Sequence, residues 1–192
     1  MNILFLKKIK SEIDAFEHAR QQIIHMSSDN LKLAKKTIFE IHRDNLNLAK
    51  ENIDILEEKF ATIEKDYIKK IPSLRYEGAY KASIEEYAEA KIFYEYIANN
   101  KLTPIKNVNI FYGEYIGGLC DFTGELLRKA TLHAIKGNYD QVDKFYNIIK
   151  EIMSEIIEYN LSSYLRTKAD QMKRNMKKME EIMYDISIKL RK

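Results

Sequence analysis

Long stretches of this chain place apolar residues three and four positions apart, the spacing that aligns them on one face of an α-helix. Only six glycines and two prolines occur in 192 residues, too few for the turns that a chain of many strands and hairpins requires. Three of these apolar seams are Leu46-Ala49-Ile53-Leu56-Phe60-Ile63-Tyr67, Val142-Phe145-Ile149-Ile152-Ile156-Tyr159 and Met172-Met176-Met179-Met183-Ile186-Leu190. The pattern predicts an all-α fold.

Helix boundaries follow from the few residues that interrupt a helix. Pro72 and Pro104 cannot continue an interior helical ladder, and Gly137 is suited to a left-handed C-terminal cap. The polar tetrad at residues 27–30 could be a kink or a cap within the first helix. We predict six helices, over residues 3–43, 45–70, 76–99, 108–136, 139–160 and 163–190. Since nothing indicates a linker or repeat, residues 1–192 are expected to form one domain, an elongated bundle of about six to seven long antiparallel helices.

Composition and charge limit the setting of the chain. Hydrophobic residues make up 45% of it, and 32 basic residues nearly balance 29 acidic ones, as in a globular protein with a core. The apolar run at residues 3–6 is too short for a signal peptide or for the ~20 residues of a membrane span. A single cysteine, Cys120, favours a reducing compartment, so we expect a cytoplasmic protein without a membrane segment.

The basic residues are concentrated near the C-terminus. Residues 163–192 carry a net charge of +5, whereas the first 162 residues carry −2. Such a helix could bind a polyanion, or its charges could form an ordinary solvated face. The methionine seam of the same segment favours an intramolecular core over a subunit contact, with both possible along its length.

Two acidic pairs interrupt otherwise apolar or small-residue faces. Glu86 and Glu89 are three residues apart in the third predicted helix, and Asp121 and Glu125 are four apart in the fourth, so each pair shares a helical face. Glycines at 117, 118 and 124 surround Asp121, although interior glycines disfavour a helix by about 1 kcal/mol each. Close approach of another helix or of a ligand is the usual reason for such glycines.

If these two helices face each other, up to four carboxylates surround one cavity. Oxygen-only ligands suit Mg²⁺ or Mn²⁺, which can polarise a phosphoryl oxygen and generate a nucleophile from water. A ferritin-like di-iron site is disfavoured, because no histidine lies three residues after a glutamate. The pattern alone also permits acids that bind only water or lysine.

Several segments resemble the family of translin and translin-associated factor X (TRAX), and the similarity covers almost the whole chain. The run Asp121-Phe122-Thr123-Gly124-Glu125-Leu126-Leu127-Arg128, the segment Glu86-Tyr87-Ala88-Glu89-Ala90 and residues 36–43 are similar to TRAX, whereas residues 177–188 and Gly137-Asn138-Tyr139 look more like translin. One departure is the stretch of residues 73–83, where translin is rich in Arg and His and this chain has only Arg75 and Lys81 as bases.

The resemblance implies an all-helical subunit of a closed, roughly octameric shell that handles single-stranded RNA or DNA. In this family TRAX is the Mg²⁺-dependent endoribonuclease subunit, and its catalytic and metal-binding acids fall on Glu86, Glu89, Asp121 and Glu125. Translin, the mainly nucleic-acid-binding subunit, lacks acids at the first three of these positions. Because this chain combines TRAX-like acids with a translin-like C-terminal segment, a homo-oligomer is expected.

The leading hypothesis is therefore a Mg²⁺- or Mn²⁺-dependent endoribonuclease acting on single-stranded RNA. The residues predicted to contact nucleic acid are Lys35, Lys36, His42, Arg43, Arg128, Lys129, Lys173, Arg174, Lys177 and Lys178. The alternative is a non-catalytic shell that binds single-stranded RNA or DNA mainly through phosphate contacts, with structural acids. A third reading is a helical scaffold for protein partners.

Overall fold

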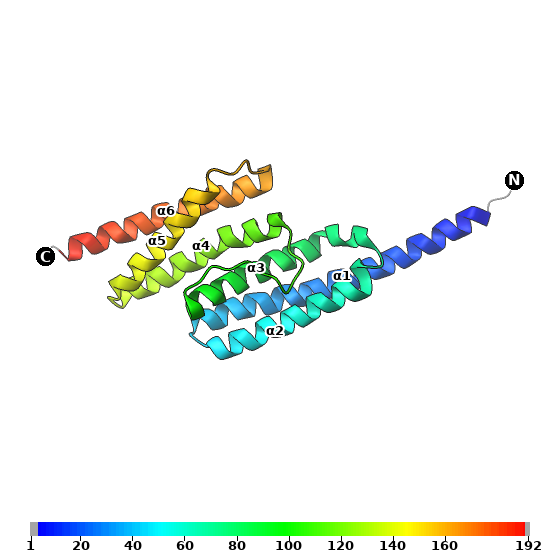
Figure 1. Ribbon diagram of the computed structural model, residues 1–192, viewed down its shortest axis with the longest axis horizontal. Helices are drawn as coiled ribbons and strands as arrows, with labels where there is room; N and C mark the ends of the chain where they lie inside the picture. The colour runs from blue at the N-terminus through cyan, green and yellow to red at the C-terminus, as the bar shows by residue number, and fades with distance from the viewer. Residues whose placement is uncertain (1–3, 191–192) are drawn as a thin grey trace.

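The computed structural model describes residues 4–190, which form helices and the segments that connect them (Figure 1). In chain order the elements are α1 (Leu4–His42), α2 (Leu46–Ile63), the π-helical turn η1 (Glu64–Ile68), the 3₁₀ turn η2 (Pro72–Tyr76), α3 (Gly78–Asn99), α4 (Tyr112–Ile135), α5 (Tyr139–Ile156) and α6 (Ser163–Lys189). The predicted all-α class is confirmed. Ile3, Arg191 and Lys192 lie outside the described residues.

The helices form two groups that meet along one contact. Helices α1, α2 and α3 pack against one another, as do α4, α5 and α6, and the two groups are joined mainly where α3 packs on α4.

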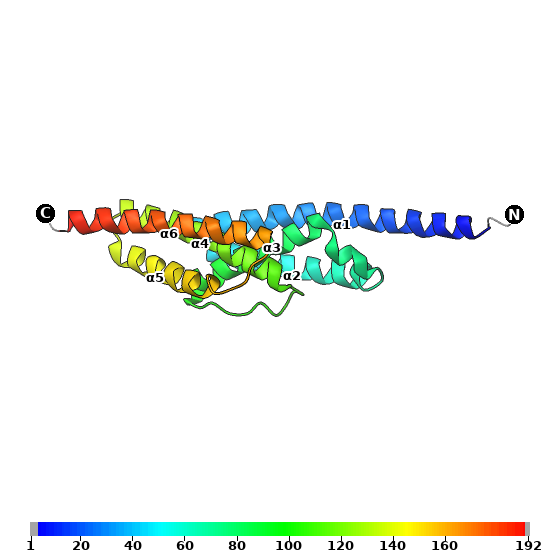
Figure 2. The same cartoon turned by 90° about the horizontal axis from the view of Figure 1, so that it is seen from above.

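The termini lie at opposite ends of the elongated molecule, and the N-terminal part of α1 extends beyond the other helices (Figures 1 and 2). On that part, large apolar side chains such as Phe5, Leu6, Ile9 and Ile13 are exposed. None of the described helices has the length and apolar character needed to span a bilayer.

The apolar seams are buried as their spacing predicts. Ile53, Leu56 and Phe60 of α2 and Val142 and Ile149 of α5 are almost fully buried. Met172, Met176 and Met179 of α6 also lie in the core, so the preferred intramolecular role of the methionine seam is confirmed over this stretch. Gly137 adopts φ +78° directly after α4, as a left-handed cap requires.

The structure corrects several helix boundaries. The second helix ends at Ile63 and changes into the π-helical turn η1, instead of continuing to residue 70. The polar tetrad produces neither a kink nor a cap, since α1 continues through it with Ser27 and Asn30 buried. The fifth helix ends at Ile156 rather than at 160. The fourth helix begins at Tyr112 rather than at 108, because the Glu114 carboxylate accepts a hydrogen bond from the Phe111 N–H (2.8 Å) at the first helical turn.

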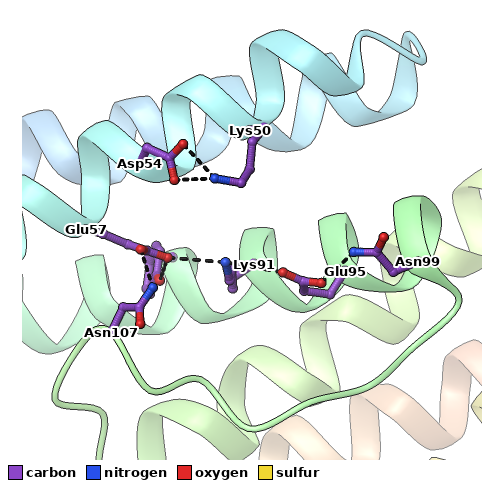
Figure 3. A network of polar contacts seen from close by, with 8 residues as sticks. Lys50, Asp54, Glu57, Lys91, Glu95, Asn99 and Asn107 are labelled. Atoms are coloured by element: carbon purple, nitrogen blue, oxygen red, sulfur yellow. Dashed lines mark hydrogen bonds and ion pairs between the residues drawn. The ribbon is translucent and has the colours of Figure 1, made fainter.

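Residues 100–111 cross the molecule without regular structure and are attached to α2 and α3 by a polar network (Figure 3). Asn107 donates a hydrogen bond to Glu57 (2.6 Å), and Lys91 forms ion pairs with Glu57 (3.2 Å) and Glu95 (3.3 Å). Tyr87 donates its hydroxyl to the same Glu57 carboxylate (2.8 Å). These bonds fix the path of the chain between α3 and α4.

Two glycines allow α3 and α4 to approach each other closely. A Cβ atom on Gly118 would lie 2.8 Å from both the Glu85 carbonyl oxygen and the Glu89 backbone nitrogen. A Cβ on Gly117 would overlap the Glu85 carboxylate. Because the atoms against Gly118 are backbone, neither helix can relieve the clash by moving a side chain.

We predict that Gly118→Ala lowers the free energy of unfolding by roughly 1–3 kcal/mol, since overpacking here must separate two backbones. Gly113→Ala in the same helix is the matched control, because a Cβ there meets nothing within 4 Å. That control should leave stability unchanged or raise it by up to about 1 kcal/mol. Urea unfolding of both variants measures the difference, and equal stabilities would contradict a close helix contact at Gly118.

Candidate metal centre and nucleic-acid interface

The close contact of α3 with α4 brings all four predicted acids around one cavity of ≈ 420 Å³, here called the carboxylate cavity. Helix α3 contributes Glu86 and Glu89, and α4 contributes Asp121 and Glu125. The rest of the lining comes from α1, α4 and α6 and consists of Lys35, Ile38, Phe39, Gly124, Arg128, Gln171 and Asn175. Four helices therefore converge on the acids.

The two acids of α3, Glu86 and Glu89, contact no positively charged side chain in the described residues. In the described part of the chain, neither Glu86 nor Glu89 forms a hydrogen bond or an ion pair. The Glu89 side chain is buried, at 7% exposure, and its burial together with the charges of Asp121, Glu86 and Glu125 raises its pKa to about 9. Burial also raises the pKa of Glu86. A buried carboxylate in this state favours either a proton or a bound cation.

The two acids of α4 are held by neighbouring side chains. Asp121 pairs with Lys168 of α6, although burial still raises the Asp121 pKa. Lys168 also pairs with Glu85 (2.7 Å), so its ammonium group bridges Glu85 and Asp121, and the pKa of Lys168 is raised even though burial opposes the shift. Glu125 pairs with His42 and lies 3.7 Å from Arg128.

The donor chemistry of the cavity suits a hard divalent cation. Within residues 4–190, no three His, Cys, Asp or Glu side chains already stand close enough together to hold a metal ion. Four carboxylates nevertheless line the same cavity, and the charge of Glu86 contributes to the raised pKa of Glu89, while neither has a contacting cation in the described residues. Oxygen ligands of this kind are those that Mg²⁺ and Mn²⁺ prefer.

Most of the predicted nucleic-acid contacts lie on the surface. Lys35 and Arg128 are exposed at the carboxylate cavity, and the Arg128 guanidinium lies over the Phe39 ring (5.3 Å to the centroid). The other exposed members are Lys36, Arg43, Lys173, Arg174, Lys177 and Lys178. None of these six lines the carboxylate cavity.

The His42 side chain is only 6% exposed and Lys129 is buried, so the structure does not support their prediction as phosphate contacts. The His42 ring is held by Glu125 and packs beside Phe93, with 5.0 Å between the ring centroids. Lys129 donates to the Ile41 carbonyl oxygen (3.2 Å) and to Asp44 (2.7 Å). Lys129 therefore stabilises the end of α1, where unpaired helical carbonyls attract a cation.

Sequence reasoning missed Lys168 as part of the site. Lys168 lies four residues before Met172 and so continues the buried seam of α6, at a position where a cation faces the interior of the bundle. That interruption of an apolar face was the available signal. Gln171 and Asn175 were missed as well, and Asn175 is fixed by a hydrogen bond to Thr123 (3.1 Å).

The raised pKa of Glu89 predicts a stability change with pH in protein treated with a chelator. Between about pH 5 and about pH 9 the folded state holds a proton that the unfolded chain has released, so the free energy of unfolding falls as pH rises. Glu89→Gln should remove much of this decrease, whereas Glu155→Gln, at an exposed position, should keep it. Thermal unfolding across this range checks it, and identical pH profiles for both variants would contradict a buried acid at Glu89.

The fold is shared with solved structures that match nearly the whole chain. A structure named apo-NeC3PO superposes with a TM-score of 0.86 at 25% identity, covering 96% of this chain and 98% of that one. The structure of an AfC3PO–duplex RNA complex gives a TM-score of 0.87 at 17% identity, covering 95% of this chain and 96% of that one. AfC3PO itself gives 0.87 at 18% identity, covering 95% and 97%.

Sequence comparison agrees with the structural likeness. The translin-associated protein X homolog of Schizosaccharomyces pombe (strain 972 / ATCC 24843) is 26% identical over 146 residues, which cover 66% of this chain and 63% of that protein. The match thus spans less than two thirds of that relative's length. The profile of the Translin family matches residues 18–190. Since this match takes in almost all of the chain, the protein belongs to the Translin family.

Proposed function

We propose that this protein is a divalent-cation-dependent endoribonuclease that cleaves single-stranded RNA. The observation that carries the proposal is the convergence of Glu86, Glu89, Asp121 and Glu125 on one cavity. Exposed Lys35 and Arg128 at the same cavity supply cations suited to a phosphate group. A fold neighbour described in complex with duplex RNA and a relative named as a translin-associated protein X homolog support a nucleic-acid substrate.

The four acids would hold Mg²⁺ or Mn²⁺. When bound, the cation supplies Lewis-acid polarisation of the phosphoryl oxygen and a water of lowered pKa. Without a cation, Glu89, the most enclosed of the four, is the group suited to hold a proton at its carboxylate oxygen, because burial disfavours its charged form. His42 orients the Glu125 carboxylate by its hydrogen bond.

Arg128 is the residue suited to orient the substrate phosphate. Its guanidinium lies one turn beyond Glu125 and is half exposed, while the Phe39 ring beneath it limits its motion. Guanidinium groups bind phosphate through two parallel hydrogen bonds, which fixes orientation as well as charge. Lys129 has no part in this step, because its ammonium group is bonded inside the fold.

We further infer a cytoplasmic homo-oligomer, with an octameric shell as the form that the family resemblance implies. The exposed apolar side chains on the N-terminal part of α1 support self-association, because a surface of this kind is unfavourable in contact with water. The subunits would then present several carboxylate cavities to one RNA.

A non-catalytic RNA-binding role is the second candidate. Asp121 and Glu125 already pair with Lys168 and His42, so these two acids could serve only the packing of α4 against α1 and α6. A binding protein of this type would retain RNA without producing fragments.

The proposal predicts that purified protein cuts a labelled single-stranded RNA in Mg²⁺ and that EDTA abolishes the cut. Glu86→Gln/Glu89→Gln should lower the cleavage rate by at least about 100-fold while RNA binding is retained, because removing the metal-binding carboxylates affects the reaction more than phosphate contacts. The measurement is product formation on a denaturing gel, together with a gel shift of uncleaved RNA.

Glu95→Gln is the control, since Glu95 also lies on α3 but pairs with Lys91 outside the cavity. It should cleave as the unaltered protein does. Bound but intact RNA in every lane would favour the non-catalytic candidate, and cleavage retained by the double variant would remove the α3 acids from the mechanism.

Phosphate contact by Lys35 and Arg128 predicts a change in salt dependence. Lys35→Ala/Arg128→Ala should lower the slope of log affinity against log salt concentration by about 2, one for each lost phosphate contact. Lys59→Ala, an exposed lysine on α2, should leave the slope unchanged. Fluorescence anisotropy with uncleaved RNA measures both. An unchanged slope in the double variant would place the phosphate contacts elsewhere.

A further inference from the structure

A second cavity, of ≈ 510 Å³, is bordered by aromatic side chains and is here called the aromatic cavity. Four rings from three separate segments line it, together with the cationic groups of Arg75 and Lys81. The rings are Tyr76 at the end of η2, Phe111 and Tyr112 at the start of α4, and Tyr164 at the start of α6. Segments far apart in sequence thus place their aromatic residues at one location.

Two of the rings are held in fixed orientations. Arg75 donates two hydrogen bonds to the Glu114 carboxylate (3.1 and 3.0 Å), and its guanidinium lies 4.1 Å from the centroid of the Phe111 ring. Tyr164 donates its hydroxyl to Glu85 (2.6 Å). Both rings are nevertheless open to solvent, with Phe111 at 40% and Tyr164 at 55% exposure. The contacts with Arg75 and Glu85 hold these two rings in place without a ligand.

The other two rings contribute nothing visible to the fold. Tyr76 is 68% exposed and Tyr112 is 82% exposed, and in the described part of the chain neither forms a hydrogen bond or an ion pair. Single exposed aromatic residues are ordinary, but two beside two ordered rings on one cavity form a surface suited to a flat ligand. Aromatic rings stack on any nucleobase, because every base presents a π-face.

The aromatic cavity adjoins the carboxylate cavity. Glu85 lines the former and the next residue, Glu86, lines the latter. Lys168 bridges Glu85 and Asp121, so one ion-paired wall separates the two cavities. A strand with a phosphate at the carboxylate cavity would therefore have a neighbouring nucleotide beside the rings. Lys81, exposed and without an ion pair in the described residues, could neutralise the next phosphate.

We propose that the aromatic cavity binds a nucleobase of the single-stranded RNA by stacking, next to the nucleotide whose phosphate lies at the carboxylate cavity. This inference rests on the proposed nuclease function and adds a base-binding subsite to it. The cavity volume lies within the roughly 300–1,000 Å³ of small-molecule sites. Unpaired bases of a single strand can enter such a cavity, whereas bases in a duplex are stacked and enclosed.

The absence of tryptophan from the sequence gives a direct optical test. Tyr112→Trp places the only indole at the aromatic cavity, and Tyr184→Trp places it on the exposed C-terminal part of α6 as a control. In EDTA, an oligouridine strand should quench the fluorescence of the first variant by stacking. An abasic strand of equal length and charge should bind without quenching, and the second variant should show no quenching with either strand.

Affinity gives the independent measurement. Tyr76→Ala/Tyr112→Ala should weaken binding of oligouridine at least about fivefold and leave binding of the abasic strand unchanged, because only base stacking is lost. Circular dichroism checks folding, which neither exposed side chain should affect.

The outcomes separate this inference from the proposed function. Tight RNA binding or Mg²⁺-dependent cleavage with no quenching, or equal quenching by the abasic strand, would overturn the base-binding subsite alone. No binding of any strand by the unaltered protein would overturn both. Base-dependent quenching without cleavage would support the subsite and contradict the nuclease.

Discussion

The backbone contact between α3 and α4 is the constraint on which the site depends. Because Gly118 carries no side chain, the α4 backbone reaches the peptide groups of Glu85 and Glu89, and the two helix groups of the molecule meet at this point. The same contact directs Glu86 and Glu89 toward Asp121 and Glu125. A side chain of any size at this crossing would separate the acids as well as the helices. The packing of the two helices and the assembly of the four acids therefore both require glycine at position 118.

Charge inside the carboxylate cavity is only partly balanced. Lys168 and His42 come from α6 and α1 and hold the α4 acids, while the α3 acids have no contacting cation in the described residues. These two contacts connect the outer helices to the crossing, because each joins an acid of α4 to a different neighbouring helix. The two acids without a contacting partner belong to α3, the helix that also borders the aromatic cavity.

The sequence predicts the helices of this structure well. The apolar seams through Ile53, Phe60 and Met176 mark the face of each helix that packs into the core, and these residues are buried. The four acids could also be identified, because a charge on an apolar face is visible locally. Local sequence patterns do not show which distant residue of the chain a side chain contacts in the fold. His42 and Lys129 look like surface bases until Glu125 and Asp44, each more than eighty residues away, come into contact with them. The late start of α4 likewise depends on Glu114, whose carboxylate is fixed by Arg75 from a distant turn.

Helix α1 has exposed apolar side chains near its N-terminal end and lines the carboxylate cavity near its C-terminal end. It runs for 39 residues without a break, about 58 Å at 1.5 Å per residue. Its N-terminal part extends beyond the other helices (Figure 2). Its C-terminal part supplies Lys35 and Phe39 to the carboxylate cavity. The projecting apolar end and one wall of the carboxylate cavity therefore belong to a single helix. A contact made by that end acts on the same element that shapes the cavity.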